Sequence, residues 1–369
     1  MTCFNLLPLE LFKCRSLKVL LLRQNLFDGE VNQGLNSSLF IQLINLNFLD
    51  LQSNSFKGVW NFETLLSSLP NLTGLDLSYS GLTVLSDNST AYVNPNFWFL
   101  NLASCNLNAF PKSLRAMKNL QYLLLYGNNI QGRIPDLAGE IGGNRLIAAD
   151  LSNNSITGLP QFQWDGITQL SFQSNMIQGP FPPSICNMSN LQYLDLSNNS
   201  FNGVIPQCIG NISSLGMLHL GANLFNGTIP NACTDYGQLT WFILNKNQFE
   251  GEVPTSLSKC RNLQILDLGN NHLYGTFPSW LSDLPGLQDI SQRLEVTDGD
   301  GDEDEDESGF TWKVVMLGYG CGALPGLVIA YVMLPTGKPK WLNAIFDATE
   351  HMIQTRKNKR KRRYMFIGK

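Results

Sequence analysis

The sequence has few of the residues and spacings that build a metal site. None of its eight cysteines forms a C-x-x-C pair of the kind that zinc sites use. His272 and His351 have no potential ligand at a useful spacing. We therefore expect no metal and no cofactor. Cys3 and Cys14 are candidates for an extracellular disulfide. The cysteines that recur about once per repeat are interpreted as small buried residues: Cys186, Cys208, Cys233 and Cys260.

The sequence also lacks a recognisable secretory leader. Its first residues, MTCFNLLPLELFKCRSLKVL, have no basic n-region, no clean apolar run and no small-residue cleavage site. We interpret this as an incomplete gene record, and the alternative is a product that does not reach the cell surface.

One uncharged run, VVMLGYGCGALPGLVIAYVML (314–334), is long enough to cross a bilayer as a helix. Eight carboxylates lie just before it in 296–308, and ten Lys and Arg against two acids fill the last 32 residues. Loops rich in Lys and Arg stay in the cytosol. We therefore predict a single-pass type I plasma-membrane protein with four parts: an ectodomain (1–290), an acidic linker (291–311), a transmembrane helix (312–335) and a cytoplasmic tail (336–369).

Small residues at a spacing of four follow one side of the predicted membrane helix: Gly318, Gly322, Gly326 and Ala330. Such a stripe lets a second helix approach closely, so it predicts a helix–helix contact. The tail segment RKNKRKRR (356–363) has the composition of a nuclear signal, but beside a membrane span it favours anionic lipid. Nucleic acid is not expected as a partner.

A repeat of about 24 residues occupies most of the chain. Its clearest copies are LDLSNNSFNGVIP (194–206), LHLGANLFNGTIP (218–230) and LDLGNNHLYGTFP (266–278). The repeated Asn recurs at intervals of 24 residues from Asn175 to Asn271, and weaker copies upstream bring the count to eleven. Periodicity of this kind indicates a solenoid built from stacked units.

Elementary chemistry explains the LxxLxLxxNxFxGxIP pattern. The Leu residues point into a core that one unit cannot close alone, and the LxL segments pair as a parallel sheet on the concave side. The Asn amide satisfies buried backbone groups, Gly adopts an angle that Cβ forbids, and Pro ends the extended piece. The predicted fold is an α/β leucine-rich-repeat solenoid. Residues 281–290 begin a twelfth unit without an LxLxxN core, and neither end shows a recognisable polar cap.

Residues between the Leu positions of each strand are expected to face solvent on the concave side. Aromatic side chains on such a sheet predict a protein- or peptide-binding surface, although strands favour aromatics in any case. The candidate ligand-binding residues are Phe99, Tyr122, Tyr193, Asp195, His219 and Trp241.

An enzyme is not expected. Ser171, Asp195 and His219 fall in one column on consecutive strands, which places Asp between Ser and His. A hydrolase triad needs His in the middle. The sequence also predicts N-glycosylation, because N-x-S/T sequons occur only before the apolar run, at Asn36, Asn71, Asn88, Asn153, Asn187, Asn198, Asn211 and Asn226.

The order of a repeat solenoid, an acidic stretch, WKVVMLGYGCGALPGLVIAYVML, TGKPKWL and a short basic tail resembles plant receptor-like proteins, particularly Cf-type disease-resistance receptors. SLSKCRNLQILDLGNNHLYGTFPSWLSDLPGLQ and EHMIQTRKNKRKRRY resemble the same family. The resemblance implies a receptor without a kinase domain that recognises a pathogen-derived protein or peptide. It also implies signalling through a partner receptor-like kinase, with Gly318, Gly322 and Gly326 in the contact between the two membrane helices.

The chain departs from the family in lacking a signal peptide, cysteine-paired caps, and an island followed by further repeats. Three alternatives stay open: a developmental receptor for an endogenous peptide, a soluble inhibitor of the polygalacturonase-inhibiting type, and a non-functional truncated paralogue. The uncharged run argues against the inhibitor.

Overall fold

A computed structural model describes residues 9–29, 40, 42–87, 93–233, 237–287 and 289–291. The chain divides into two compact units, Met1–Asp298 and Gly299–Lys369. The description below concerns the first. The predicted acidic linker, membrane helix with its small-residue stripe, and basic tail lie outside the described residues. Among the residues that are described, no helix has the length and apolar character needed to cross a membrane.

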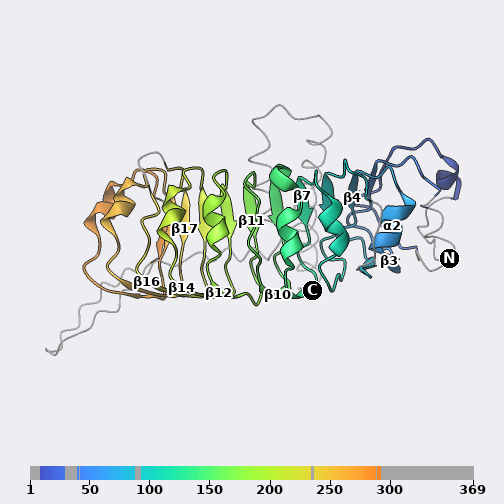
Figure 1. Cartoon of the computed structure of the whole chain (residues 1–369). Coiled ribbons are helices and arrows are strands. Elements are labelled where there is room, and N and C mark those ends of the chain that lie inside the picture. The colour runs from blue at the N-terminus through green and yellow to red at the C-terminus, as the bar shows by residue number, and fades with distance from the viewer. Residues whose placement is uncertain are drawn as a thin grey trace, which may run out of the picture. The chain divides into compact units, whose positions relative to one another are not determined.

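Twelve short parallel strands form one continuous sheet in the described part of the chain (Figure 1). Each coil of the solenoid contributes one strand, and each strand pairs with those of the coils before and after it. The strands are β1 (Val19–Leu21), β2 (Phe48–Asp50), β4 (Gly74–Asp76), β6 (Phe99–Asn101), β7 (Tyr122–Leu124), β9 (Ala148–Asp150), β11 (Gln169–Ser171), β13 (Tyr193–Asp195), β15 (Met217–His219), β17 (Trp241–Ile243), β19 (Ile265–Asp267) and β21 (Asp289–Ser291).

The register of this sheet confirms the predicted columns. Tyr193 pairs with Met217, and Met217 pairs with Trp241, so equivalent residues of successive repeats lie side by side. The twelfth unit that begins in residues 281–290 adds a strand to this sheet. Asp289 pairs with Ile265 in a twelfth strand, although its segment lacks the LxL pattern. Backbone hydrogen bonds to the preceding strand suffice to extend a sheet by one strand.

Further short strands, of two to four residues, form a second set of pairings on another side of the coils. A five-stranded sheet contains β12 (Gln178–Pro180), β14 (Ser200–Gly203), β16 (Leu224–Gly227), β18 (Gln248–Gly251) and β20 (His272–Leu273). Two further pairs are β8 (Gln131–Arg133) with β10 (Ser155–Gly158), and β3 (Val59–Asn61) with β5 (Thr83–Leu85). Gly203 shows why the repeat needs glycine, because its φ is 76°.

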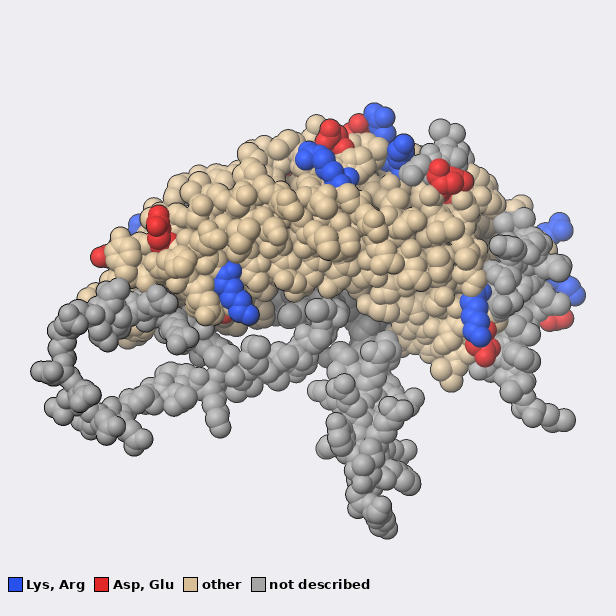
Figure 2. Space-filling view, turned by 90° about the horizontal axis from the view of Figure 1, so that it is seen from below, with Lys and Arg blue, Asp and Glu red and all other residues tan. Residues whose placement is uncertain are grey.

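Single turns of 3-10 helix follow the Pro of most repeats. They are η2 (Lys112–Ala116), η3 (Asp136–Glu140), η5 (Pro183–Asn187), η6 (Gln207–Asn211), η7 (Thr255–Lys259) and η8 (Ser279–Asp283), with η1 (Leu9–Lys13) and η4 (Gly143–Arg145) elsewhere. The described part holds one α-helix, α2 (Phe62–Ser68), whose first turn is capped by the Asn61 side chain on the Thr64 amide. Figure 2 views the unit from the side where β10, β12, β14 and β16 lie in Figure 1, and its described surface carries few charged side chains.

The repeated Asn side chains join neighbouring coils, as predicted. Asn223 is buried and donates to the carbonyl oxygens of Leu196 (2.9 Å) and Leu220 (3.1 Å), while its own oxygen accepts from the Phe201 amide (3.0 Å). One side chain thus satisfies three buried backbone groups in two coils. Cys105 fills the same slot with weaker bonds, 3.2 Å and 3.6 Å from its sulfur to backbone oxygens.

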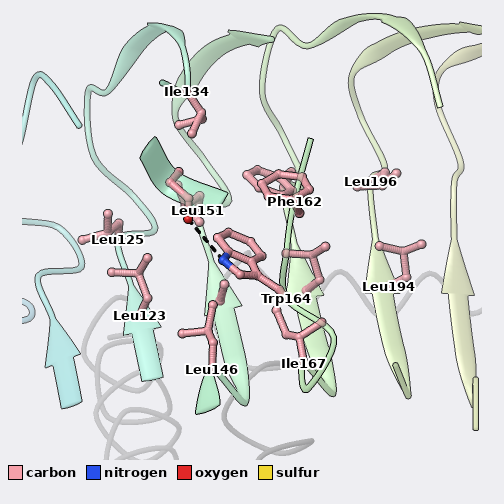
Figure 3. Close-up of a cluster of buried hydrophobic side chains, with 14 of the residues drawn as sticks. Leu123, Leu125, Ile134, Leu146, Leu151, Phe162, Trp164, Ile167, Leu194 and Leu196 are labelled. Atoms are coloured by element: carbon pink, nitrogen blue, oxygen red, sulfur yellow. Dashed lines mark hydrogen bonds between the residues drawn. The ribbon is translucent and has the colours of Figure 1, made fainter. Parts of the chain in front are cut away.

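The core is a continuous stack of Leu, Ile and Phe side chains. Phe201, Phe225 and Phe249 stack with ring centroids 5.8 Å and 6.4 Å apart. Between β10 and β11 the chain forms no helical turn, and Trp164 fills the interior there instead. Its indole donates to the Ala138 carbonyl at 3.2 Å, and Phe162 stacks on it at 4.4 Å (Figure 3).

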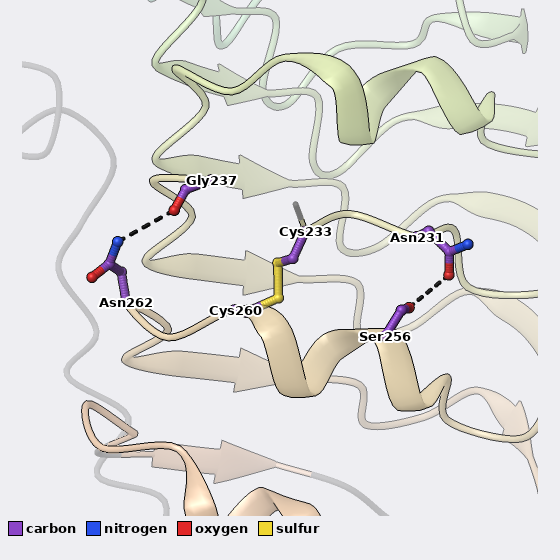
Figure 4. Close-up of a disulfide and its surroundings, with 6 residues drawn as sticks. All are labelled: Asn231, Cys233, Gly237, Ser256, Cys260 and Asn262. Atoms are coloured by element: carbon purple, nitrogen blue, oxygen red, sulfur yellow. Dashed lines mark hydrogen bonds between the residues drawn. A yellow bond between two sulfur atoms is a disulfide. The ribbon is translucent and has the colours of Figure 1, made fainter. Parts of the chain in front are cut away.

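Of the four cysteines interpreted as small buried residues, Cys233 and Cys260 are buried and Cys186 and Cys208 are half-buried, and all four form disulfides that the interpretation did not include. Cys186 pairs with Cys208, and Cys233 pairs with Cys260. In the second pair, Cys260 follows η7 and Cys233 lies in the coil before it (Figure 4). The partners lie 22 and 27 residues apart, which is one coil, so each disulfide fastens two adjacent coils. Cys14, a candidate for a disulfide with Cys3, is exposed and unpaired, and Cys3 lies outside the described residues.

Candidate ligand-binding face

The concave sheet carries all six predicted ligand-binding residues. Phe99 lies on β6, Tyr122 on β7, Tyr193 and Asp195 on β13, His219 on β15 and Trp241 on β17. Phe99, His219 and Trp241 are partly exposed, but Tyr122, Tyr193 and Asp195 are buried. The expectation that every alternate residue faces solvent is therefore wrong for these three. Residues of one column lie about 4.8 Å apart on neighbouring strands, so large side chains cover one another.

An aromatic cluster occupies the N-terminal half of this sheet. The Phe48 ring lies over Gly74, on the intervening strand β4, in the space that a Cβ at Gly74 would need. Phe48 and Phe99 therefore approach to 5.8 Å between centroids, although their strands do not pair directly. Phe99 lies 6.1 Å from Tyr122 and 5.4 Å from Trp98, which precedes β6. Trp98 was missed because it stands outside the alternating positions.

A polar cluster lies farther along the sheet. The Asp195 carboxylate accepts from the Tyr193 hydroxyl (3.3 Å), and the same oxygen lies 3.2 Å from Nδ1 of His219. Its other oxygen accepts from the Ser197 amide (2.9 Å) and hydroxyl (2.7 Å). Burial acts to raise the pKa of Asp195, but the bond to His219, the charge on His219 and the Ser197 bonds outweigh it and lower that pKa.

The same carboxylate position recurs in five coils, and one of its oxygens has a fixed structural role. At Asp50, Asp76, Asp150, Asp195 and Asp267, Oδ1 accepts from the amide two residues later, at 2.9 to 3.0 Å. This bond closes the turn that leads to the repeated Asn. The second oxygen has other partners where they are seen: Asn101 at Asp76, and Tyr193 and His219 at Asp195.

Two of these carboxylates lie on paired strands, because Asp50 and Asp76 face each other in the register of β2 and β4. Burial, and then the charge of Asp50, raises the pKa of Asp76 to about 7, although bonds from Ser78 and Asn101 oppose the shift. Burial also raises the pKa of Asp50. At pH 6 this part of the face therefore holds protons that two free carboxylates would have lost.

The geometry agrees with the argument against a hydrolase. Ser171 pairs with Asp195, and Asp195 pairs with His219, so the acid stands between the other two residues. No group of three metal-ligating side chains gathers within the described ranges. An open polar depression of about 520 Å³, lined by Lys118, Glu140, Asn144 and Gln163 among others, lies beside η3 and η4 instead of on the concave strands.

Six of the eight predicted sequons fall on described residues. Asn71, Asn187, Asn198, Asn211 and Asn226 are exposed, and Asn153 is half-buried. Asn36 and Asn88 lie outside the described residues. Asn187 and Asn211 end the helical turns η5 and η6, away from the concave strands.

Comparison with known proteins finds leucine-rich repeats in this chain and similar plant proteins. The leucine-rich-repeat family matches residues 165–225, and also 119–140 and 262–284. Receptor-like protein 6 of Arabidopsis thaliana is 33% identical over an alignment of 192 residues, and the match covers 46% of this chain and 19% of that protein. Receptor like protein 23 of the same plant is 31% identical over an alignment of 200 residues, and the match covers 47% of this chain and 22% of that protein. This chain carries leucine-rich repeats and is similar in sequence to plant receptor-like proteins.

Solved structures show the same architecture in this leucine-rich-repeat protein and in plant receptors. The plant peptide hormone receptor RGFR1, solved in complex with RGF2, is 28% identical with a TM-score of 0.63, and the match covers 78% of this chain and 49% of that one. The ectodomain of the Arabidopsis thaliana receptor kinase GASSHO1/SCHENGEN3, in complex with CASPARIAN STRIP INTEGRITY FACTOR 2, is 31% identical with a TM-score of 0.61, covering 78% and 37%. The chain spans about a fifth of the length of the curated relatives it matches.

Proposed function

We propose that this protein is a cell-surface receptor-like protein that binds an extracellular peptide or protein on its concave sheet. The observation that carries the proposal is the cluster of four aromatic rings at Phe48, Trp98, Phe99 and Tyr122 on the twelve-stranded sheet, of which all but Tyr122 are partly exposed. Aromatic side chains supply large contact areas at little entropic cost, and they dominate the energetics of protein interfaces.

The proposed ligand is a peptide or an extended protein segment. A row of short parallel strands offers a long surface without a deep enclosed cavity, which suits an extended chain better than a compact small molecule. RGFR1 was solved in complex with RGF2, and GASSHO1/SCHENGEN3 in complex with CASPARIAN STRIP INTEGRITY FACTOR 2, and these complexes support the same mode here. A pathogen-derived ligand and a role in plant immunity extend the proposal from the resemblance to Cf-type receptors.

A developmental role is the second candidate. It is favoured by one observation, that RGFR1 is a receptor for a peptide hormone. The two candidates differ in the source of the ligand and share the binding surface.

The proposed signalling route uses the uncharged run 314–334 as a membrane helix and a receptor kinase as the partner. Gly318, Gly322, Gly326 and Ala330 would form the contact, because small residues let two helices approach closely in lipid. The proposed topology has residues 1–311 outside the cell. The solenoid has two disulfides and five exposed sequon asparagines, and both features support an extracellular location.

The first test is expression in plant cells with a C-terminal tag, followed by peptide-N-glycosidase. Added glycans would show that the solenoid entered the secretory pathway, and the enzyme would then increase the electrophoretic mobility of the chain. Unchanged mobility would contradict the proposed location. The second test is a pull-down comparing the wild type with Gly322→Leu. We expect the larger side chain to remove a kinase partner, whereas Leu327→Ile, which keeps the side-chain volume, should leave it bound.

A further inference from the structure

The row of single helical turns along the solenoid is interrupted in one coil, and a hollow lies at the interruption. Neighbouring turns pack on each other where consecutive coils both have one, as η2 does with η3, η5 with η6 and η7 with η8. The coil between β10 and β11 has no such turn, so irregular chain separates η3 from η5. The open polar depression of about 520 Å³ lies at this gap, and we call it the η3–η5 hollow.

The lining of the η3–η5 hollow is mostly polar. Lys118, Glu140 and Asn144 contribute donors and acceptors from the coils before the gap, and Gln163 and Asp165 contribute others from the coil within it. The Lys118 ammonium lies 3.0 Å from the Glu140 carboxylate, so the lining has no concentration of charge of one sign. Mixed donors and acceptors suit a neutral ligand with many hydroxyl and amide groups, such as a sugar, better than they suit an ion or an apolar molecule.

Asn187 is a second and independent observation at the hollow. It belongs to the lining, and it is also the acceptor residue of an N-x-S/T sequon. It ends η5 and is exposed, and no hydrogen bond within the described part of the chain holds its side chain. Ser189, which completes the sequon, is exposed as well. A glycan on Asn187 would therefore begin at the edge of a polar hollow.

We propose that the η3–η5 hollow binds the core N-acetylglucosamine residues of a glycan carried by Asn187. The glycan is attached when Nδ2 of Asn187 loses a proton and bonds to C1 of the first sugar, which leaves its lipid diphosphate carrier. A ligand tethered beside its site acts at an effective concentration of roughly millimolar, so contacts too weak to hold a free sugar suffice here. The bound sugars take the place of the missing helical turn. This inference rests on the proposed function, because only a solenoid that enters the secretory pathway receives the glycan.

Asn211 is the matched comparison within the same chain. It ends η6 as Asn187 ends η5, it is exposed, and Ser213 completes its sequon. Its helical turn packs against η5, and Asn211 is not among the residues that line the hollow. A glycan on Asn211 is therefore expected to extend into solvent.

The test uses the full chain expressed in plant cells with the mannosidase inhibitor kifunensine, so that every glycan stays of the oligomannose type. Endoglycosidase H, which cleaves between the two core N-acetylglucosamine residues, is applied to the folded protein, and glycopeptide mass spectrometry follows each site with time. Only an undocked core fits the enzyme, so a glycan that is docked about nine-tenths of the time should be released about 10-fold more slowly. We expect that delay at Asn187 and not at Asn211, and equal rates at the two sites after denaturation.

A variant of the lining tests whether the hollow causes the delay. Gln163 is exposed and lines the hollow, so Gln163→Ala removes a hydrogen-bonding group from the sugar and should speed release at Asn187 about 3- to 10-fold. Release at Asn211 should not change. Gln161→Ala, at an exposed position outside the lining, is the control and should leave both rates as they are in the wild type.

Removal of the glycan gives a separate readout. Ser189→Ala abolishes the sequon but keeps Asn187, and we expect faster amide hydrogen exchange in residues 139–145 and 161–166, which the docked sugars otherwise shield. Ser213→Ala abolishes the matched sequon and should leave exchange in these two segments unchanged. Equal exchange in Ser189→Ala and the wild type would overturn the docking.

The outcomes separate this inference from the function on which it rests. A glycan on Asn211 with none on Asn187, or equal release at the two sites of the folded protein, overturns the docking and leaves the extracellular receptor intact. A chain without a glycan at either site contradicts the proposed location, and the docking with it.

Discussion

His219 lies beside Asp195 and not beside Ser171, with 3.2 Å between its Nδ1 and the Asp195 carboxylate. Because Asp195 separates the two residues in the sheet register, the column forms a structural polar cluster. The same column supplies the carboxylates on which the concave surface depends. Asp195 has two roles, since its Oδ1 accepts from the Ser197 amide and closes the turn, whereas its Oδ2 contacts Tyr193 and His219.

The first prediction concerns the Asn side chains that link the coils. Asn223→Ala leaves the Leu196 and Leu220 carbonyl oxygens and the Phe201 amide without partners. Unmet buried polar groups cost roughly 1–3 kcal/mol each, so we expect a loss of about 3 kcal/mol, measured by urea unfolding. Asn202→Ala, at an exposed position one coil earlier, is the control and should change stability by less than about 0.5 kcal/mol. Equal effects for the two variants would show that the Asn bonds are unimportant.

The second prediction concerns the disulfide between adjacent coils. Replacing Cys186 and Cys208 together by Ser opens a link across 22 residues. The chain-entropy relation gives about 3 kcal/mol for a loop of this length, so the midpoint of unfolding should fall clearly. Cys14→Ser is the matched control, because that thiol is exposed and unpaired. If the double variant unfolds like the control, the two cysteines are not bonded in the protein.

The third prediction concerns pH. The pKa of Asp76 is raised to about 7 in the folded protein, first by burial and then by Asp50, above its ordinary value of 3.8. A raised pKa stabilises the fold at low pH, and this contribution is lost as the pH rises from about 4 through 7. We expect Asp76→Asn to flatten the decline in stability between pH 5 and pH 8, measured as thermal midpoints. Asp283→Asn, on a surface helical turn, serves as the control. An unchanged pH profile in Asp76→Asn would contradict the shift.

The fourth prediction concerns backbone conformation. Gly203 has a φ of 76°, and a Cβ built there meets no atom within 4 Å. The cost of Gly203→Ala should therefore come from the left-handed backbone alone, about 1–2 kcal/mol. Gly216→Ala is the comparison, because a Cβ there makes ordinary contacts from 3.5 Å. We expect little effect at Gly216, and a similar loss at both positions would mean that the φ angle is not the cause.

Much of the solenoid could be predicted from the sequence, because the repeat places equivalent atoms at fixed intervals. The Leu and Asn spacing predicts that Tyr193 pairs with Met217, and that the Asn223 side chain bonds to backbone groups of the neighbouring coil. The strand β21 was missed because backbone pairing, and not an LxL pattern, forms it. The second set of strands also escaped prediction, since each is short and carries no alternation of its own.

The candidate site could be placed but not characterised. Spacing puts Asp150, Ser171 and Asp195 in one column, yet it does not reveal which carboxylate oxygen has a partner. The Phe48 ring reaches Phe99 because Gly74 leaves room for it, a relation that depends on three strands at once. To predict the disulfides, one must know that each coil of about 24 residues brings equivalent positions of the chain side by side.

The central claim is that the concave sheet binds the ligand, and one affinity comparison tests it most directly. Peptides selected on the full chain from a random phage-displayed library are titrated against the wild type, Trp241→Ala and Tyr274→Ala. Trp241 lies on the concave strand β17, whereas Tyr274 is 61% exposed and follows β20 in the second sheet. We predict at least about 10-fold weaker binding for Trp241→Ala and unchanged binding for Tyr274→Ala. Equal affinity for Trp241→Ala and the wild type, with loss at Tyr274→Ala, would contradict the account.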